Sequence, residues 1–256
     1  MEFKISKEFF QEIESLIANK NERELLRMLE DIHFADIAEL MNELKGEIND
    51  LVRDGNELMN ELKGEDAGYL FKILDSEVSS EILLELDDEV REKILNNLSA
   101  KEIAEELDEM DTDDAVDIIA ELPEEMKEEV ISELEDFEHA KDIVELLRYD
   151  EDTAGGLMAK EFIQVNENWN VLTCIQEIRK QAENVSRVHS IYVVDDEERL
   201  KGRLSLKDLI TSSTTTKVID IFIPKVDSVK VDTEDTEVAR IMQKYDLEAI
   251  PVVDET

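Results

Sequence analysis

The chain has 256 residues, and 68 Asp and Glu against 28 Lys and Arg give it a formal net charge of -40. A surface this negative repels phosphate groups, which excludes nucleic acid as a partner and favours cations or basic surfaces. The scarcity of Gly (7) and Pro (3) indicates a largely helical protein, and the single cysteine, Cys174, excludes an intrachain disulfide framework. Because no apolar run reaches the roughly 18–20 residues that span a bilayer, and the N-terminus is acidic, we expect a soluble intracellular chain.

The negative charge is concentrated in the first part of the chain. Residues 1–152 hold 49 acids and 15 bases, a net charge of -34, whereas residues 153–256 hold 19 acids and 13 bases, a net charge of -6. This asymmetry indicates two modules. Close carboxylates repel one another, and a divalent cation relieves that repulsion while gaining oxygen ligands. The alternative interpretation of these acids is a solvated helical face that keeps the protein soluble.

Apolar residues recur every 24 residues between about 74 and 146. The four series are Leu74, Leu98, Leu122 and Leu146; Leu83, Leu107 and Ile131; Leu86, Met110 and Leu134; and Leu95, Ile119 and Ile143. Such a repeat accommodates two short helices, and stacked units bury a seam that no single unit could bury, which predicts a superhelix. Within one unit, the spacing of 3 or 4 residues predicts a single amphipathic helical stripe through Leu83, Leu86, Val90, Ile94 and Leu98.

Helix starts in these repeats are predicted at Asp75, Ser99 and Pro123, each of which is followed within three residues by glutamate. An N-cap side chain or an early proline satisfies or removes free backbone N–H groups, and the acids suit the helix dipole. Upstream, the segment ELMNELKGE occurs at 39–47 and again at 57–65. We interpret it as a local duplication, which is either absorbed within a helix or accommodated as a loop or broken helix at Gly46, Gly55 and Gly64.

The hydrophobic period changes after residue 160. The pattern predicts strands at 162–165, 191–194, 199–205, 229–231 and 249–253, and helices around 171–178, 206–210 and 234–245. A polar linker at 211–216 separates a complete βαββα unit from a second, incomplete copy. Because the last strand of that copy would leave an open sheet edge, we expect the sequence to be a piece of a longer protein.

Two features of the sequence resemble a known family. The tandem βαββα units are similar to a cystathionine-β-synthase (CBS) pair, and LRYDEDTAGGLM at 147–158 resembles the join between the helical and CBS domains of MgtE-type magnesium channels. The resemblance implies a mixed fold, in which an all-α superhelical domain (1–152) precedes an α+β tandem CBS pair (153–212 and an incomplete 213–256). It also implies a homodimer that forms through the CBS domains, on the cytoplasmic face of the membrane, with the transmembrane domain beyond residue 256.

The resemblance places metal ligands in both the helical part and the CBS part of the chain. The family's inter-domain acids fall on Asp113 and Asp117, with Asp114 beside them, and the i,i+4 spacing puts the first two on one helix face. On the CBS side the match is Asp246, with Gln243 offering a backbone carbonyl; Thr236 stands where the family often has an acid. The alternatives are an N-cap for Asp113 and plain solvated acids for Asp117 and Asp246. Hard oxygen ligands suit Mg²⁺, Ca²⁺ and Mn²⁺ alike.

A second candidate site is GRLSLKD at 202–208. The resemblance to nucleotide-binding CBS pairs implies that the Ser205 hydroxyl meets phosphate, Asp208 meets the ribose hydroxyls and Lys207 adds positive charge, so ATP becomes a candidate ligand. The alternative is a capping box, because Ser205 and Asp208 have the spacing of one.

Nothing in the sequence indicates an enzyme. His33, His139 and His189 are isolated, Cys174 has no motif around it, and none of the many carboxylates stands out as a general acid. We therefore expect a regulatory domain that senses magnesium by cation-bridged closure of the helical domain onto the CBS pair and so gates a channel. The alternatives are an adenine-nucleotide sensor attached to another effector, and an acidic scaffold that recruits a basic protein.

Overall fold

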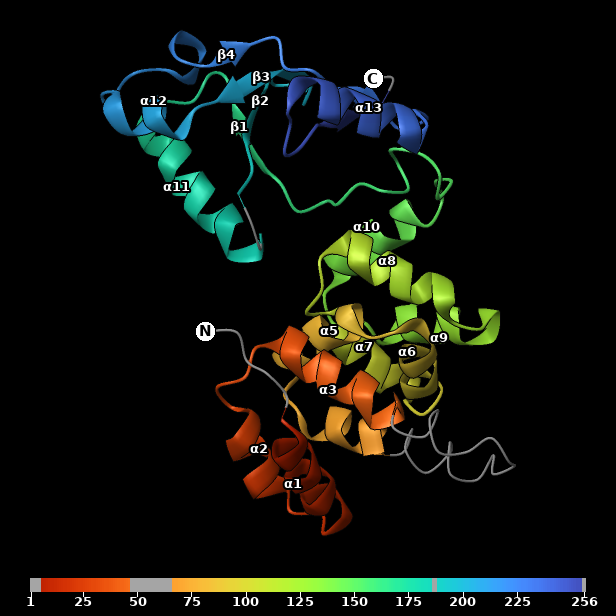
Figure 1. The fold of residues 1–256 in the computed structure, drawn as a ribbon. Helices are drawn as coiled ribbons and strands as arrows, with labels where there is room; N and C mark the ends of the chain where they lie inside the picture. Colours follow the sequence, from red (N-terminus) through yellow and green to blue (C-terminus); the bar gives the residue numbers. More distant parts are fainter. Residues whose placement is uncertain (1–5, 47–65, 186–187, 255–256) are drawn as a thin grey trace. The chain divides into compact units, whose positions relative to one another are not determined.

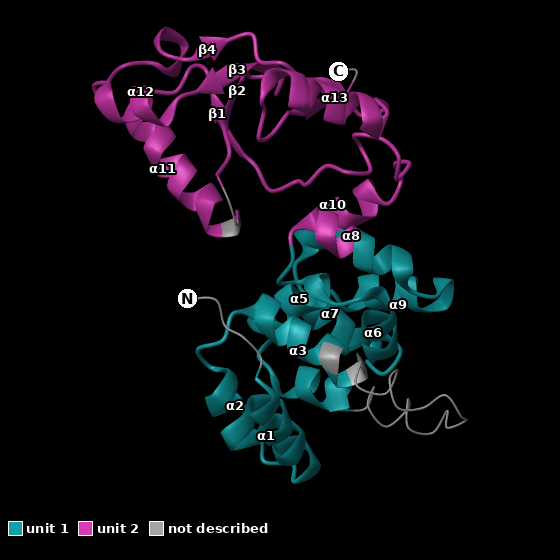
Figure 2. Cartoon of the chain, viewed as in Figure 1, with its two compact units in different colours: residues 1–110, 117–140 teal, residues 111–116, 141–256 magenta. Residues whose placement is uncertain are grey.

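The structure, a computed structural model, describes residues 6–46, 66–185 and 188–254. It divides into two compact units (Figure 2): Met1–Met110 with Asp117–Ala140, and Asp111–Val116 with Lys141–Thr256. Two helices, α8 (Thr112–Glu121) and α10 (Phe137–Leu146), therefore contribute residues to both units. None of the described helices is both long and apolar enough to cross a bilayer.

The first unit is built from short helices (Figure 1). In chain order these are α1 (Lys7–Ala18), α2 (Glu22–Leu29), α3 (Phe34–Gly46), the helical residues 66–73, α5 (Ser76–Glu85), α6 (Asp88–Leu95), α7 (Ala100–Leu107), the end of α8, α9 (Glu124–Glu133) and the start of α10. The predicted period is confirmed, because α5, α7 and α9 begin at Ser76, Ala100 and Glu124. Helix α5 packs against α7, and α7 packs against α9.

The predicted helix starts are also confirmed. The Asp75 side chain accepts a hydrogen bond from Glu77 N at 3.3 Å and caps α5. Ser99 caps α7 in a reciprocal capping box, in which its Oγ accepts from Glu102 N while Glu102 Oε2 accepts from Ser99 N at 2.7 Å. Pro123 takes the N-cap position of α9. Local side-chain chemistry thus sets these boundaries.

One helical prediction is wrong. The residues Leu83, Leu86, Val90, Ile94 and Leu98 are buried as expected, but they do not form the stripe of a single helix. Helix α5 ends at Glu85, Leu86 is extended, and α6 begins at Asp88. Asp87 then takes the N-cap position of α6 with extended ψ, so the chain turns while its apolar residues still face one core.

The duplicated segment is described only in part. Most of its first copy forms the end of α3, where Leu40, Met41 and Leu44 are buried. The second copy, at 57–65, lies outside the described residues. The choice between a continuous helix and a loop therefore stays a prediction.

The second unit contains a four-stranded sheet in the order β1-β2-β3-β4 and a two-stranded sheet of β5 and β6. The strands are β1 (Ile163–Asn166), β2 (Ile191–Val194), β3 (Leu200–Leu204), β4 (Ile223–Pro224), β5 (Val229–Lys230) and β6 (Val252–Val253). Strands β1 and β2 are parallel, β2, β3 and β4 are antiparallel neighbours, and β5 pairs with β6 in parallel. The helices are α11 (Val171–Gln181), α12 (Leu206–Thr211) and α13 (Asp235–Tyr245), with short 3₁₀ turns η1 (Ala182–Asn184) and η2 (Val218–Asp220).

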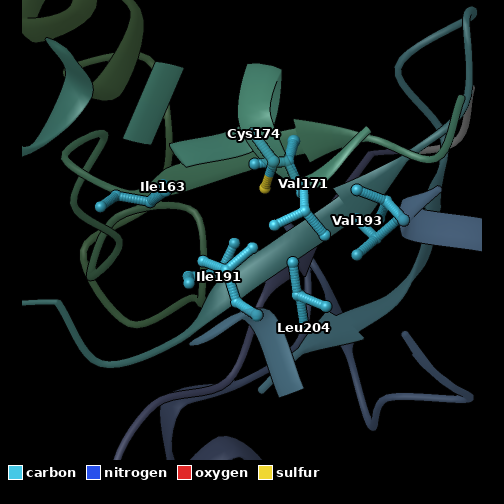
Figure 3. Close-up of a cluster of buried hydrophobic side chains, with 9 residues drawn as sticks. Ile163, Val171, Cys174, Ile191, Val193 and Leu204 are labelled. Carbon is cyan, nitrogen blue, oxygen red and sulfur yellow. The ribbon is translucent and has the colours of Figure 1, made fainter. Parts of the chain in front are cut away.

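The strand, helix, strand, strand, helix order predicted for the first CBS copy is confirmed, and its core lies between the sheet and α11. Figure 3 shows this cluster, which comprises Ile163, Val165, Val171, Cys174, Ile191, Val193, Leu204, Leu209 and Val218. Cys174 is fully buried, and burial raises the pKa of its thiol to about 11. It is therefore a small packing residue.

The structure differs from prediction at the end of the sheet. Strand β4 was not anticipated, because it has only two residues and one of them is Pro224. Strand β6 is shorter than the predicted 249–253, and it follows Pro251, which has no N–H for the ladder. Gly202 lies where β3 meets β4, and a Cβ there would be 2.2 Å from Ile223 O, so this approach requires glycine.

Residues 152–155, which join the helical repeats to the first βαββα copy, bind the second, incomplete copy. Ala154 N donates to Thr233 O at 2.8 Å and Gly155 N donates to Val231 O at 2.9 Å. Asp235 N, at the start of α13, donates to Asp152 O at 3.0 Å. Gly155 also packs closely against Tyr149, because a Cβ on Gly155 would be 2.6 Å from the Tyr149 ring. This packing explains why glycine stands at that position.

Candidate functional site

The first candidate ligands lie on α8. Asp113 and Asp114 are in its first turn and are half-buried, whereas Asp117 is exposed one turn later. The opposite face of the helix is anchored by the buried residues Ala115, Val116, Ile118 and Ile119. This amphipathic division keeps the carboxylates at the surface, where they can reach a hydrated cation.

The N-cap alternative for Asp113 is wrong. Helix α8 begins at Thr112, and the first helical hydrogen bond runs from Ala115 N to Asp111 O at 3.0 Å. Because the N-cap residue is the one whose carbonyl accepts that first bond, Asp111 takes the N-cap position. Asp113 lies inside the first turn, where its negative charge interacts favourably with the helix dipole.

The candidate ligands on the CBS side lie at the end of α13. Gln243 and Asp246 are both exposed. Asp246 is the C-cap residue in the left-handed conformation, at φ 53° and ψ 52°, and its N–H donates to Met242 O. Because Asp, Asn and Gly adopt this conformation most readily, helix termination is by itself a reason for Asp at this position.

Among the residues that the structure describes, no three His, Cys, Asp or Glu side chains are grouped closely enough to hold a metal ion. The chemistry of the donors nonetheless fits a hard cation, since carboxylate and carbonyl oxygens are the ligands that Mg²⁺ and Ca²⁺ prefer. The assignment of Asp113, Asp114, Asp117, Gln243 and Asp246 as metal ligands therefore stays a prediction.

The candidate nucleotide residues follow β3. Ser205 is half-buried at the N-cap position of α12, Lys207 is exposed, and Asp208 is half-buried. The Ser205 side chain makes no capping hydrogen bond, so the predicted alternative, a capping box, is not formed. The roles of the three side chains in binding a nucleotide stay predictions.

Thr112 makes contacts that the sequence did not indicate. Its Oγ1 is 2.9 Å from Glu161 Oε2, its backbone N donates to the same oxygen at 3.2 Å, and Lys160 N donates to Thr112 Oγ1 at 2.9 Å. The residues lie 48 and 49 positions apart in the chain. No periodicity or motif connects them, so only the folded structure could show this contact.

A part-buried carboxyl group was also missed. Glu106 on α7 lies 2.7 Å from the Ser79 hydroxyl on α5, and the same hydroxyl is 3.1 Å from Asp75 O. Burial raises the pKa of Glu106 to about 7; Ser79 opposes this effect, and the negative charges of Glu105, Glu109 and Asp75 add to it. A protonated Glu106 can donate to Ser79 Oγ, which leaves the single hydroxyl hydrogen of Ser79 for Asp75 O. The contact is thus best satisfied with the proton in place.

Two of the histidines and Trp169 make packing or hydrogen-bonding contacts. His139 Nε2 lies 3.1 Å from Leu107 O, and the His33 ring lies against Phe34 with ring centroids 4.1 Å apart. Trp169 packs on the CBS core directly before α11, and its carbonyl accepts from Val218 N at 2.8 Å. These contacts belong to the packing and hydrogen bonding of the fold.

The fold thus defines a class: an acidic helical-repeat domain followed by CBS-type α+β units. A family model of the MgtE intracellular N domain matches residues 52–152, and a CBS domain model matches residues 154–214. The chain is 46% identical over 114 residues to the magnesium transporter MgtE of Thermus thermophilus, covering 44% of this chain and 25% of that protein. It is 37% identical over 113 residues to the magnesium transporter MgtE of Enterococcus faecalis, again covering 44% of this chain and 25% of that protein.

Two solved structures match almost the whole chain. The crystal structure of the cytosolic domain of the Mg²⁺ channel MgtE in complex with ATP superposes with a TM-score of 0.81 at 32% identity, covering 96% of this chain and 93% of that one. The soluble part of a magnesium transporter superposes with a TM-score of 0.75 at 27% identity, covering 96% and 89%. The chain belongs to the MgtE family. The matched segment is about a quarter of the length of the curated relatives.

Proposed function

We propose that the chain is the magnesium-sensing regulatory region of a magnesium transporter, placed on the cytoplasmic side of the membrane, and that it gates a pore formed by the rest of the protein. The observation that carries this proposal is the 32% identity and TM-score of 0.81 to the cytosolic domain of a Mg²⁺ channel, over 96% of this chain. The proposal includes domains at 1–152, 153–212 and 213–256 and a homodimer that forms through the CBS domains.

The mechanism rests on the charge of the helical part. Residues 1–152 carry a net charge of -34, so their approach to a second acidic surface is opposed by repulsion. Asp113, Asp114 and Asp117 on α8 would hold a divalent cation together with Asp246 and the Gln243 carbonyl from the end of α13. Bound cations would then favour a closed arrangement of the helical and CBS domains, and their loss would favour an open one. The ligand set leaves room for water, as Mg²⁺ prefers.

The test compares the size of the protein in solution across a magnesium titration. We expect the radius of gyration from small-angle scattering to fall as Mg²⁺ rises through the millimolar range, and the melting temperature to rise. At a concentration about ten times the dissociation constant, preferential binding contributes about 1.4 kcal/mol, or about 3–5 °C for a chain of this length. If NaCl at matched ionic strength produces the same compaction, the acidic surface is only screened, and the protein is an acidic scaffold rather than a sensor.

Substitutions locate the ligands. Asp113→Asn with Asp117→Asn should raise the magnesium midpoint of compaction about tenfold, since two carboxylates of the site are lost. The matched control is Glu125→Gln with Glu129→Gln on α9, which removes the same charge from an exposed pair with the same i,i+4 spacing. Equal midpoints for the two double variants would refute the assignment of Asp113 and Asp117 and leave only a general charge effect.

The second candidate function is that of an adenine-nucleotide sensor. It is favoured by one observation, namely that the similar cytosolic domain was crystallised in complex with ATP. Calorimetry with ATP and AMP in magnesium-free buffer would test it, with Ser205→Ala and Asp208→Asn as the binding variants and Ser213→Ala on the following linker as the control. Nucleotide binding without magnesium-dependent compaction would favour this function over the first.

A further inference from the structure

Thr112 lies where the join between the two modules meets helix α8. The residue is 1% exposed, and its hydroxyl both donates and accepts a hydrogen bond. The hydroxyl donates to Glu161 Oε2 at 2.9 Å and accepts from Lys160 N at 2.9 Å. The backbone N–H of Thr112 donates to the same Glu161 oxygen at 3.2 Å. We call these three hydrogen bonds the Thr112 clamp.

The clamp satisfies one of the free N–H groups at the start of α8. The first N–H groups of a helix have no partner within the helix, and a side chain just before the helix usually satisfies one of them. In α8 the partner of the Thr112 N–H is a carboxylate 49 residues further along the chain. A negative charge there also interacts favourably with the positive end of the helix dipole. The first turn of α8 is therefore held by the joining segment.

The clamp lies between two functional parts of the chain. On one side, Asp113 and Asp114 are the next two residues of α8. On the other side, β1 begins at Ile163, two residues after Glu161, and Ile163 is buried in the CBS core. The first turn of α8 is thus connected to β1 through two residues of backbone.

A neighbouring ion pair is a weaker connection. Lys160 Nζ lies 2.7 Å from Glu145 Oε1 on α10, with side chains 21% and 41% exposed. Pairs that are this accessible to solvent contribute little, because water screens them and two long side chains must be held in place. The buried Thr112 hydroxyl has no such screening, so the clamp to α8 is the stronger connection and the ion pair to α10 the weaker one.

We propose that Thr112 and Glu161 are positioning residues that hold the first turn of α8 against the segment leading into β1, and that this clamp couples cation binding at α8 to the CBS domains. The inference rests on the proposed magnesium-sensing function and adds the route by which the signal leaves the cation site. It assigns no metal-binding role to either residue.

The test uses two substitutions at one position. Thr112→Val keeps the shape of the side chain but removes the hydroxyl, which leaves Lys160 N–H without its acceptor; Thr112→Ser keeps the hydroxyl. We expect Thr112→Val to raise the magnesium midpoint of compaction about fivefold or more, in the range of typical coupling energies. Thr112→Ser should stay within about twofold of the unsubstituted chain, since both of its hydrogen bonds can form.

Two controls separate coupling from simple destabilisation. Glu145→Gln breaks only the Lys160 ion pair, and its midpoint should stay within about twofold. Melting temperatures in EDTA measure the stability lost without any cation, and amide exchange at Thr112 and Lys160 shows whether the clamp has opened. A variant that is merely less stable would melt earlier in EDTA without a shifted midpoint.

The outcomes are distinguishable. If the unsubstituted chain compacts with magnesium and Thr112→Val has the same midpoint, the positioning role is refuted while the sensing function stands. An equal shift in Thr112→Val and Thr112→Ser would also refute it, because the hydroxyl would then be irrelevant. If the unsubstituted chain shows no magnesium-specific response, the sensing function is refuted and the coupling role with it.

Discussion

The raised pKa of Glu106 makes the stability of the helical repeats depend on pH near neutrality. In the folded chain its pKa is about 7, against the usual 4.5 in an unfolded one. Between these values the folded chain binds a proton that the unfolded chain has lost, so the free energy of unfolding falls as pH rises. The stabilisation is complete below about pH 4.5 and is lost above about pH 7. Glu106→Gln, a neutral mimic of the protonated acid, should remove this dependence.

The magnitude follows from the size of the pKa change. A rise from 4.5 to about 7 corresponds to an upper limit of about 3 kcal/mol. The Glu106 side chain is only part-buried, and solvent screening reduces the figure to about 1–2 kcal/mol. We therefore expect the free energy of unfolding of Glu106→Gln, relative to that of the unsubstituted chain, to rise by about 1–2 kcal/mol as the pH increases from about 5 to about 8. The Gln amide can donate to Ser79 Oγ as the protonated acid does.

The assay is native-state amide exchange of α5 and α7, compared between variant and unsubstituted chain at each pH so that the intrinsic exchange rate cancels. Local exchange is preferable to a melt, because a chain with two compact units need not unfold in one step. Glu125→Gln, an exposed acid on α9, controls for the loss of one negative charge. A stability difference for Glu106→Gln that does not change with pH would refute a neutral Glu106, as would a variant less stable than the unsubstituted chain at pH 8.

Two further predictions concern stability. Ser99→Ala should cost about 1 kcal/mol in urea unfolding followed by circular dichroism, since it removes the capping box with Glu102. Asp87→Ala, at an N-cap position without a side-chain capping bond, should cost clearly less, and equal costs would contradict the capping argument. Gly202→Ala should cost about 1–3 kcal/mol, because its Cβ would lie 2.2 Å from Ile223 O and β4 would have to move. An unchanged melting temperature for Gly202→Ala would show that β4 moves away freely.

Much of the fold could be predicted because the relevant signals are local or periodic. The caps at Asp75 and Ser99 act within three residues, and the 24-residue period records which residues face the core. The spacing of apolar residues did not show where α5 ends, because Leu86 is buried although it is extended and lies between α5 and α6. Short elements such as β4 are formed by pairing with a neighbouring strand and have too few residues for a pattern.

The candidate site was less predictable because its features depend on distant contacts. Asp113 has the residue type of an N-cap, but α8 starts one residue before it, at Thr112. Thr112 is held by Glu161, and the two are separated by 49 residues with no common motif. The pKa of Glu106 follows from burial against a neighbouring helix, and a list of acids along the chain cannot distinguish it from its exposed neighbours.

Backbone hydrogen bonds tie the segment that precedes the first CBS copy to the second copy, so the two copies are connected at more than the linker between them. The stretch that includes Ala154 and Gly155 precedes the first copy in the chain, yet it binds the backbone at Val231 and Thr233 in the second. A displacement of Ala154 and Gly155 would therefore act on the second copy through these hydrogen bonds as well as along the chain.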